Sequence, residues 1–240
     1  MVTLPDPAKY LNSPLTKNHL RIMTLAIFDL DNTLLSGDSD YSWGQFLVRK
    51  KLVDKASYEA ANLSFYEQYK LGVLDIFEYS AFSFKPLSEC SMEQLRILHN
   101  EFMQEVIRPM MGDKAKSLVK QHQQQGHILM VITATNSFIT RPIVEAFGID
   151  NLLATDPKIV NGRYTTEIEG IPCFHDGKVR RLENWLAQNN VSLAGSCFYS
   201  DSHNDLPLME IVETAIAVDP DEKLAAVARQ RGWQIISLRD

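Results

Sequence analysis

The sequence lacks any apolar run long enough to cross a membrane. No stretch of about 18 apolar residues occurs in its 240 positions, so no transmembrane helix is expected. Residues 1–22 carry Pro5, Pro7 and Pro14 among polar groups and lack the apolar centre of a signal peptide, which predicts an N-terminal extension. We therefore expect a protein without a membrane partner.

Cysteine is scarce as well. Cys90, Cys173 and Cys197 are widely spaced and odd in number, which argues against a disulfide framework and against a zinc site. Reduced thiols are typical of a reducing compartment, so the sequence favours a cytoplasmic protein. Basic residues are not concentrated anywhere: the formal net charge is −6 and no basic run occurs, which argues against a nucleic-acid partner.

Two acids directly follow the first apolar stretch. Leu25–Phe28 predicts a buried parallel strand, and Asp29 and Asp31 come after it. Ligands of open α/β sheets bind at the carboxyl ends of the strands. Two carboxylates crowded there repel each other unless a cation or a shared proton offsets the repulsion, which favours a magnesium-assisted reaction on an anionic substrate. A helix cap or a turn is the alternative, and for this motif alone both interpretations stand.

Strands and helices alternate through the second half of the sequence. The strands are predicted at 127–132, 152–154, 196–199, 215–218 and 233–237, with a hairpin turn at Asn161-Gly162. Such alternation predicts an α/β fold, a Rossmann-like parallel sheet with helices on both faces.

A helical block interrupts the first crossover of this sheet. Its helices are predicted to start at the N-cap Asp40 and then to cover 55–71, 75–83 and 91–107, the last with a Ser91/Gln94 capping box. An insert at the carboxyl edge of a sheet suggests a cap over the site. We therefore expect three parts: the extension 1–22, a core of 23–40 and 109–240, and a helical cap of 41–108.

Three more polar groups are predicted at the same sheet edge. Thr133 follows the strand 127–132, Lys178 starts a helix, and Asp201 follows the strand 196–199. Each alone is more simply a helix cap or a solvated side chain. Lys178 opposes the helix dipole, however, and the occurrence of four such groups on one edge argues against four independent caps.

The full set resembles the haloacid dehalogenase superfamily. The resemblance rests on Asp29-x-Asp31-x-Thr33, Thr133, Lys178 and Asp201-x-x-Asn204-Asp205, and it covers nearly everything from Thr24 to Leu238. The helical insert resembles the cap of the phosphoserine-phosphatase-like branch. One departure stands out, because Ser200 and Ser202 replace the glycines that commonly flank the last motif's first acid.

This resemblance implies a phosphatase that uses Mg²⁺. By similarity, Asp29 attacks phosphorus and forms an aspartyl-phosphate, while Asp31 protonates the leaving alcohol and then activates water. The Asp29 and Asp201 carboxylates and the Asp31 carbonyl would hold the metal, and Lys178 would offset the negative charge.

The remaining motif residues are expected around the phosphate. Thr133 and the backbone N–H groups near it, including that of Ala134, would bind the phosphoryl group. By similarity, Asn204 orients the phosphate, and Asp205 fixes either Lys178 or a metal-bound water.

The cap is expected to select the leaving group, a small-molecule alcohol. Asp38 and Asp40 are candidates for contact with a substrate ammonium, although Asp40 is equally well explained as a helix cap. Phosphoserine phosphatases carry a cap arginine for the substrate carboxylate. The matching stretch here has Phe82, Phe84 and Lys85 instead. Aromatic residues there suit an imidazole better than a carboxylate, unless they belong to the cap's own core.

The sequence therefore favours a phosphatase for histidinol phosphate, as in related enzymes of this branch, over one for phosphoserine. Two alternatives remain at this stage. One is phosphoryl transfer between metabolites, as in the superfamily's mutases. The other is a non-catalytic phosphate-binding protein, which nothing favours because every catalytic position is filled.

Overall fold

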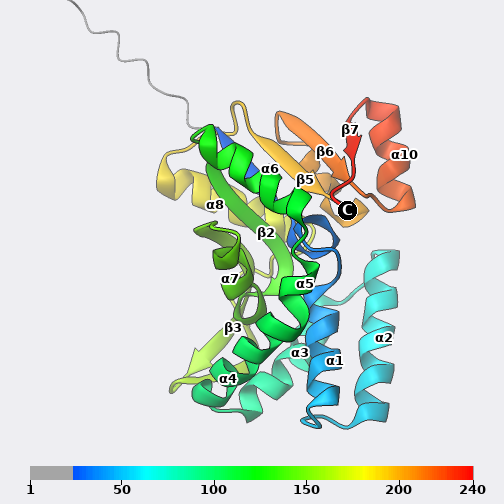
Figure 1. Ribbon diagram of the computed structural model, residues 1–240, viewed down its shortest axis with the longest axis vertical. Helices are drawn as coiled ribbons and strands as arrows, with labels where there is room; N and C mark the ends of the chain where they lie inside the picture. Colours follow the sequence, from blue (N-terminus) through cyan, green and yellow to red (C-terminus); the bar gives the residue numbers. More distant parts are fainter. Residues whose placement is uncertain (1–23, 240) are drawn as a thin grey trace, which may run out of the picture.

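A seven-stranded sheet forms the centre of the protein, as the computed structural model shows for residues 24–239 (Figure 1). The strand order is β4-β3-β2-β1-β5-β6-β7, and all neighbouring strands run parallel except the antiparallel pair β3–β4. The strands are β1 Leu25–Phe28, β2 Ile128–Asn136, β3 Asn151–Val160, β4 Arg163–Glu169, β5 Cys197–Ser200, β6 Thr214–Val218 and β7 Gln234–Ile236.

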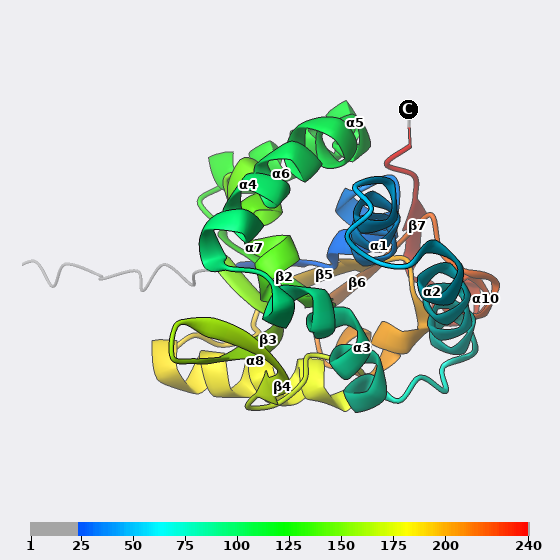
Figure 2. The same cartoon turned by 90° about the horizontal axis from the view of Figure 1, so that it is seen from below.

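Helices cover both faces of the sheet, and Figure 2 shows α6 and α8 on opposite sides of it. The predicted α/β class and Rossmann-like arrangement are therefore confirmed. The core helices are α5 Arg108–Met110, α6 Asp113–Gln124, α7 Ser137–Ala146, α8 Asp176–Asn189, α9 Leu206–Met209 and α10 Glu222–Arg231.

The central strand β1 is buried on both faces, which explains its uninterrupted apolar sequence. Ala26 and Phe28 pack into the core on the α6 and α7 side, whereas Leu25 and Ile27 pack into the core on the α8 and α10 side. All four side chains have zero exposure. The chain leaves β1 at the carboxyl edge of the sheet, where Asp29 follows.

Of the α-helices between β1 and β2 in the sequence, the first four lie beyond the carboxyl ends of the strands, in the lower half of Figure 1. We call them the cap helices: α1 Ser39–Arg49, α2 Lys55–Leu71, α3 Ile76–Glu89 and α4 Met92–Phe102. A π-helical turn, η3 Met103–Ile107, extends α4. The capping box of Ser91 and Gln94 is confirmed. The predicted start of the first helix is wrong: Asp38 is the N-cap, because its carboxylate accepts the Tyr41 N–H, and Asp40 lies in the first turn.

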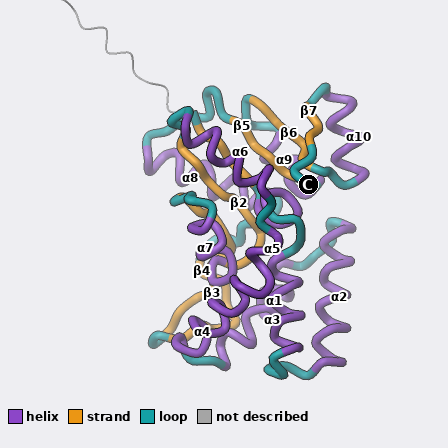
Figure 3. The backbone as a smooth tube through the Cα atoms, in the orientation of Figure 1, coloured by secondary structure: helices purple, strands orange, loops and turns teal. Residues whose placement is uncertain are grey.

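A long hairpin extends from the sheet toward the cap. The predicted strand near 152–154 and the predicted hairpin both exist, but they are not separate, because β3 continues from Asn151 to the hairpin turn and pairs with β4 after it. The turn at Asn161 and Gly162 has φ of 51° and 72°, as the Asn-Gly signal indicated. Figure 3 shows the purple helix α3 beside the orange strands of this hairpin.

Several sequence expectations concern other parts of the chain. The predicted extension 1–22 lies outside the described residues. Within them, none of the helices is long and apolar enough to cross a membrane. Cys90, Cys173 and Cys197 all carry free thiols, in agreement with the expectation of reduced cysteines.

Candidate active site

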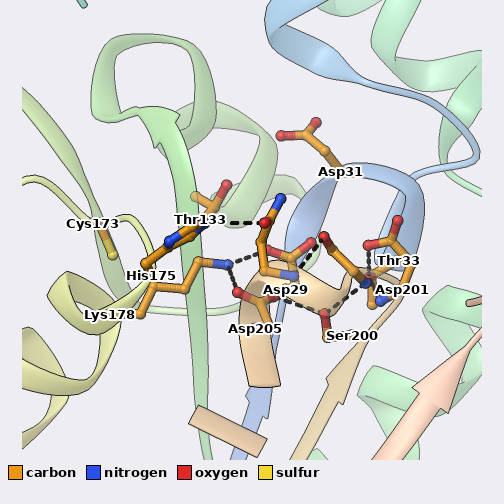
Figure 4. Close-up of polar contacts among 12 residues, drawn as sticks. Asp29, Asp31, Thr33, Thr133, Cys173, His175, Lys178, Ser200, Asp201 and Asp205 are labelled. Carbon is orange, nitrogen blue, oxygen red and sulfur yellow. Dashed lines mark hydrogen bonds and ion pairs between the residues drawn. The ribbon is translucent and has the colours of Figure 1, made fainter. Parts of the chain in front are cut away.

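Asp29, Lys178 and Asp205 form a buried cluster at the carboxyl edge of the sheet (Figure 4). The Lys178 Nζ lies 2.8 Å from Asp29 Oδ1 and 2.6 Å from Asp205 Oδ1. Asp29 follows β1, Lys178 lies in the first turn of α8, and Asp205 ends the 3₁₀ turn η4 His203–Asp205. Of the two contacts expected for Asp205, the structure contains the one with the lysine.

The electrostatics of this cluster are dominated by burial. Burial raises the pKa of Asp29 to about 7, although Lys178 acts in the opposite direction. Burial alone would lower the pKa of Lys178, but Asp205 and Asp29 outweigh it and hold that pKa well above its ordinary value. The lysine therefore stays charged, and a single cation faces several carboxylates.

Asp201 completes the acidic group at the end of β5. Burial, and then the charges of Asp29 and Asp205, raise the pKa of Asp201 well above its ordinary value. The Thr33 hydroxyl donates to Asp201 Oδ1 and accepts from the Asp201 backbone N–H, both at 3.0 Å. Thr33 thus fixes the orientation of the Asp201 carboxylate.

This donor set fits a hard divalent cation. Asp29, Asp201 and Asp205 carry three negative charges and Lys178 one positive charge, so the group has a net charge of −2 when all are ionised. Carboxylate oxygens are the ligands Mg²⁺ prefers, and Mg²⁺ commonly uses one or two carboxylates and retains several waters. Among residues 24–239, no three His, Cys, Asp or Glu side chains converge as an all-protein metal cage.

Asp31 points away from this cluster, as Figure 4 shows. Its Oδ1 accepts the Ser39 backbone N–H at 2.6 Å, and its Oδ2 accepts the Thr135 hydroxyl at 2.7 Å. Burial, and then the nearby charge of Asp38, raise the pKa of Asp31 to about 7. A carboxyl group with a pKa near neutrality can both give and take a proton under physiological conditions.

Thr133 and Ala134 line the same pocket as Asp29 and Asp31. The prediction that Thr133 follows its strand is wrong, because β2 continues to Asn136. The Thr133 hydroxyl oxygen accepts the Thr135 backbone N–H at 3.2 Å. The β2 strand therefore places two threonines beside the two acids.

Ser200 and Ser202, which replace the expected glycines, both form hydrogen bonds. The Ser200 hydroxyl donates to Asp205 Oδ2 at 2.7 Å, and the Ser202 hydroxyl oxygen accepts the Asn204 backbone N–H at 3.2 Å. Asn204 itself contacts two other segments: its Oδ1 lies 3.0 Å from His175 Nε2, and its Nδ2 donates to the Tyr69 carbonyl at 3.0 Å.

The pocket extends from the acids into the cap, where its wall is aromatic and acidic. Asp38 and Asp40 both line it. Asp40 is buried and accepts hydrogen bonds from the Tyr79 hydroxyl at 2.6 Å and from the Ser83 hydroxyl at 3.3 Å. One Asp38 oxygen caps α1 by accepting the Tyr41 N–H. The aromatic lining residues are Tyr41, Phe65, Tyr66, Tyr69 and Tyr79.

Phe82, Phe84 and Lys85 were candidates for contact with the substrate, but they are not among the residues that line this pocket, and the alternative that the aromatic residues belong to the core holds for Phe84. Phe84 is buried in the hydrophobic core with 1% exposure. Phe82 lies behind the pocket wall, with its ring centroid 5.2 Å from that of Phe65 and 4.6 Å from that of Tyr58. Lys85 is exposed and lines a separate surface groove. The rotation of α3 turns Tyr79, rather than these residues, toward the site.

Sequence reasoning missed several polar side chains of the site. Thr33 was part of the recognised motif but had no assigned role, and Thr135 lies two positions after Thr133 on the same strand. His175 carried a weaker signal, three residues before Lys178. The aromatic character of the cap side was anticipated, but the residues that supply it were not.

Comparison with known proteins places these features in a family. A family model described as haloacid dehalogenase-like hydrolase matches residues 26–210. The chain is 43% identical to a histidinol-phosphatase of Neisseria meningitidis serogroup C, over 90% of the chain and 99% of the relative. It is 29% identical to a phosphoserine phosphatase of Mycobacterium tuberculosis, over 99% of the chain and 78% of that protein. A crystal structure of a protein of unknown function from Bordetella pertussis superposes with a TM-score of 0.85 at 44% identity, covering 90% of this chain and 99% of the other.

Proposed function

The chain belongs to the haloacid dehalogenase-like hydrolase family and is a phosphoric monoester hydrolase, and we propose that its substrate is histidinol phosphate. The reaction proceeds through an aspartyl-phosphate on Asp29 with the assistance of Mg²⁺. With the hydrolase class established, the non-catalytic hypothesis has no support. Histidinol phosphate is small, carries a primary amine and an imidazole, and lacks a carboxylate, and each of these properties has a counterpart in the pocket.

The nucleophile is Asp29. Its Oδ1 is held by Lys178 at 2.8 Å, which leaves the second carboxylate oxygen available for attack on phosphorus. Lys178, Thr133 and the backbone N–H groups near it, including that of Ala134, stabilise the negative charge of the phosphoryl group in the transition state. Asp205 holds the lysine in place by accepting from its ammonium group, and the Ser200 hydroxyl holds Asp205 by donating to its other carboxylate oxygen.

Asp31 is the general acid and base. In the first step a bond forms between Asp29 and phosphorus, the ester P–O bond breaks, and the proton of Asp31 passes to the leaving alcohol. In the second step Asp31 takes a proton from water as that water attacks phosphorus, which releases phosphate and restores the Asp29 carboxylate. The hydrogen bonds from Ser39 and Thr135 hold the Asp31 carboxylate in one orientation for both transfers.

Asp29, Asp201 and the Asp31 backbone carbonyl would hold Mg²⁺. When bound, the ion supplies positive charge that polarises the phosphate oxygens. Thr33 positions Asp201 for this role through its two hydrogen bonds. With all three carboxylates ionised, the net charge of −2 around the site would match the charge of the ion.

The choice of substrate rests on one observation. The cap side of the pocket is lined by two acids and five aromatic residues, and no lysine or arginine of residues 24–239 is among its lining residues. A substrate carboxylate would meet Asp38 and Asp40 without a cation to balance it, which is unfavourable. An ammonium and an imidazole find carboxylates and aromatic faces there instead. Asp38 is the residue placed to meet the cation, because Asp40 already accepts from Tyr79 and Ser83.

Phosphoserine is the second candidate, because the Mycobacterium tuberculosis relative is named for that activity. Its carboxylate is the group that the pocket lining disfavours.

The test is Mg²⁺-dependent phosphate release from histidinol phosphate, phosphoserine and a panel of other metabolite phosphates, with Asp29→Asn as the inactive control. The proposal expects the highest kcat/KM for histidinol phosphate and no release by the variant. Acceptor-dependent transfer without net release would reveal a mutase-like reaction, and a preference for phosphoserine would reject the substrate assignment.

A further inference from the structure

His175 has a backbone conformation that side chains rarely adopt. Its φ is 47° and its ψ is −125°, a combination populated almost exclusively by glycine. Such strain persists when the surrounding contacts determine the position of the residue.

The hydrogen-bond pattern explains what the imidazole does there. The Tyr69 carbonyl can only accept, so the side-chain amide of Asn204 must direct its Nδ2 toward Tyr69. The Oδ1 of Asn204 therefore faces His175, and His175 must donate from Nε2 across the 3.0 Å contact. The Tyr69 carbonyl thus sets the orientation of the Asn204 amide, and the histidine stabilises that orientation by donating to its oxygen.

That orientation joins the cap to the core. Tyr69 lies in the last turn of α2, whereas Asn204 lies in η4, directly before Asp205. The turn after α2 approaches η4 closely, because a Cβ on Gly72 would lie 3.3 Å from Asn204 Oδ1. Asn204 is buried, so an amide turned the other way would set its oxygen against the Tyr69 carbonyl oxygen.

The ring of His175 also packs against an aromatic neighbour. The Phe174 and His175 ring centroids are 3.9 Å apart, and the Phe174 centroid lies 6.1 Å from that of Tyr69. The segment before α8 therefore reaches Tyr69 of α2 in two ways. Phe174 packs near the Tyr69 ring, and His175 reaches the Tyr69 carbonyl through Asn204.

We propose that His175 is a positioning residue that acts through Asn204 to hold α2 of the cap against the core and so keep the pocket closed over the bound ester. Because Tyr69 also lines the pocket, its contact with Asn204 links the cap–core contact to the substrate site. The role requires phosphatase activity but does not depend on which ester is hydrolysed. The Nδ2 of Asn204 carries two N–H groups, and the contact with Tyr69 uses one of them.

His175→Gly is the decisive variant, because glycine adopts this backbone conformation without strain and only the ring is lost. The matched control is Asn190→Gly, which relieves a positive φ of 55° at the other end of α8, away from the site. The hydrogen-exchange rate of the backbone amides of residues 66–74 measures how firmly the end of α2 is held against Asn204. We expect exchange about fivefold faster in His175→Gly, as for the loss of one typical hydrogen bond, and unchanged exchange in Asn190→Gly.

Kinetics with the best ester found for the wild type give the second readout. A cap that is closed less of the time lowers apparent affinity, so KM should rise by about fivefold while kcat changes less than twofold. Asn204→Ala should also raise KM, and the double variant His175→Gly/Asn204→Ala should have a KM no higher than that of Asn204→Ala alone. Unchanged exchange, a fall in kcat at constant KM, or additive effects in the double variant would each overturn the proposal.

Discussion

Lys178 and Asp29 are 149 positions apart in the sequence, yet the lysine Nζ lies 2.8 Å from Asp29 Oδ1 in the buried centre of the site. The same ammonium group lies 2.6 Å from Asp205 Oδ1. One buried cation therefore serves the nucleophile and a neighbouring carboxylate at once. The same ion pairs therefore contribute to the stability of the fold and to the chemistry of the site.

Replacing Lys178 by methionine should reduce both stability and activity. The two carboxylates would remain buried without their cation, which typically costs about 3–5 kcal/mol. Urea denaturation at pH 7 measures that loss. Adding Asp205→Asn to Lys178→Met should restore part of the stability, because one of the unpaired charges is removed, but no phosphate release. Full stability in Lys178→Met would contradict the role of this ion pair.

Asp31→Asn separates proton transfer from attack on phosphorus. An alkyl ester needs its leaving oxygen protonated, whereas p-nitrophenolate leaves without a proton. We expect kcat/KM for the best alkyl phosphate to fall by roughly 10²- to 10⁴-fold, and that for p-nitrophenyl phosphate to fall much less. Equal losses for both esters would show that Asp31 does not act as the general acid.

Asp38→Asn tests recognition of the substrate cation. Asparagine keeps the oxygen that caps α1, so the fold should be retained while the charge is lost. We expect KM for histidinol phosphate to rise by about tenfold, as for the loss of one partly buried charge pair, with little change for p-nitrophenyl phosphate. Asp54→Asn is the matched control, because Asp54 caps α2 in the same way but lines a different surface groove. A shift of equal size in the control would discount a specific role for Asp38.

His122 should make stability depend on pH. Its Nε2 lies 2.9 Å from the Tyr199 hydroxyl and its Nδ1 lies 2.8 Å from His127 Nδ1. Burial, and then the charge of His127, lower the pKa of His122 from 6.5 to about 4. The unfolded chain therefore takes up this proton below about pH 6.5 while the folded chain resists it until about pH 4, so stability falls as the pH drops through this range.

The denaturation midpoints of wild type and His122→Gln at pH 7 and pH 5 measure this effect. The denaturation midpoint should fall less between pH 7 and pH 5 in the variant than in the wild type, because glutamine does not titrate. An identical fall in both proteins would assign the pH dependence to other groups.

The residues at strand ends were predictable because their signal is local. A fully apolar β1 followed by Asp29 and Asp31 indicates both the strand and the edge at which the acids lie. Lys178 stood out because it opposes the dipole of its own helix. Sequence alone therefore identified the main polar groups of the candidate site and the α/β class.

The cap residues were not predictable, because their orientation depends on how the helices pack. Aromatic residues occur on more than one face of α3, and sequence periodicity does not say which face meets the pocket. Tyr79 lines the pocket, whereas Phe84 is buried in the core. His175 escaped notice for a similar reason, since its partner Asn204 is 29 positions away and its strained backbone has no sequence signal.

Direct competition between histidinol phosphate and phosphoserine distinguishes the two candidate substrates in a single experiment. Both esters are supplied together at equal concentration with Mg²⁺, and the two alcohols released are quantified during the first few per cent of reaction. The ratio of the two rates equals the ratio of kcat/KM. We expect histidinol to be released at least tenfold faster, because the carboxylate of phosphoserine would face two acids without a cation to pair with. Faster release of serine would contradict the proposal that the pocket prefers histidinol phosphate.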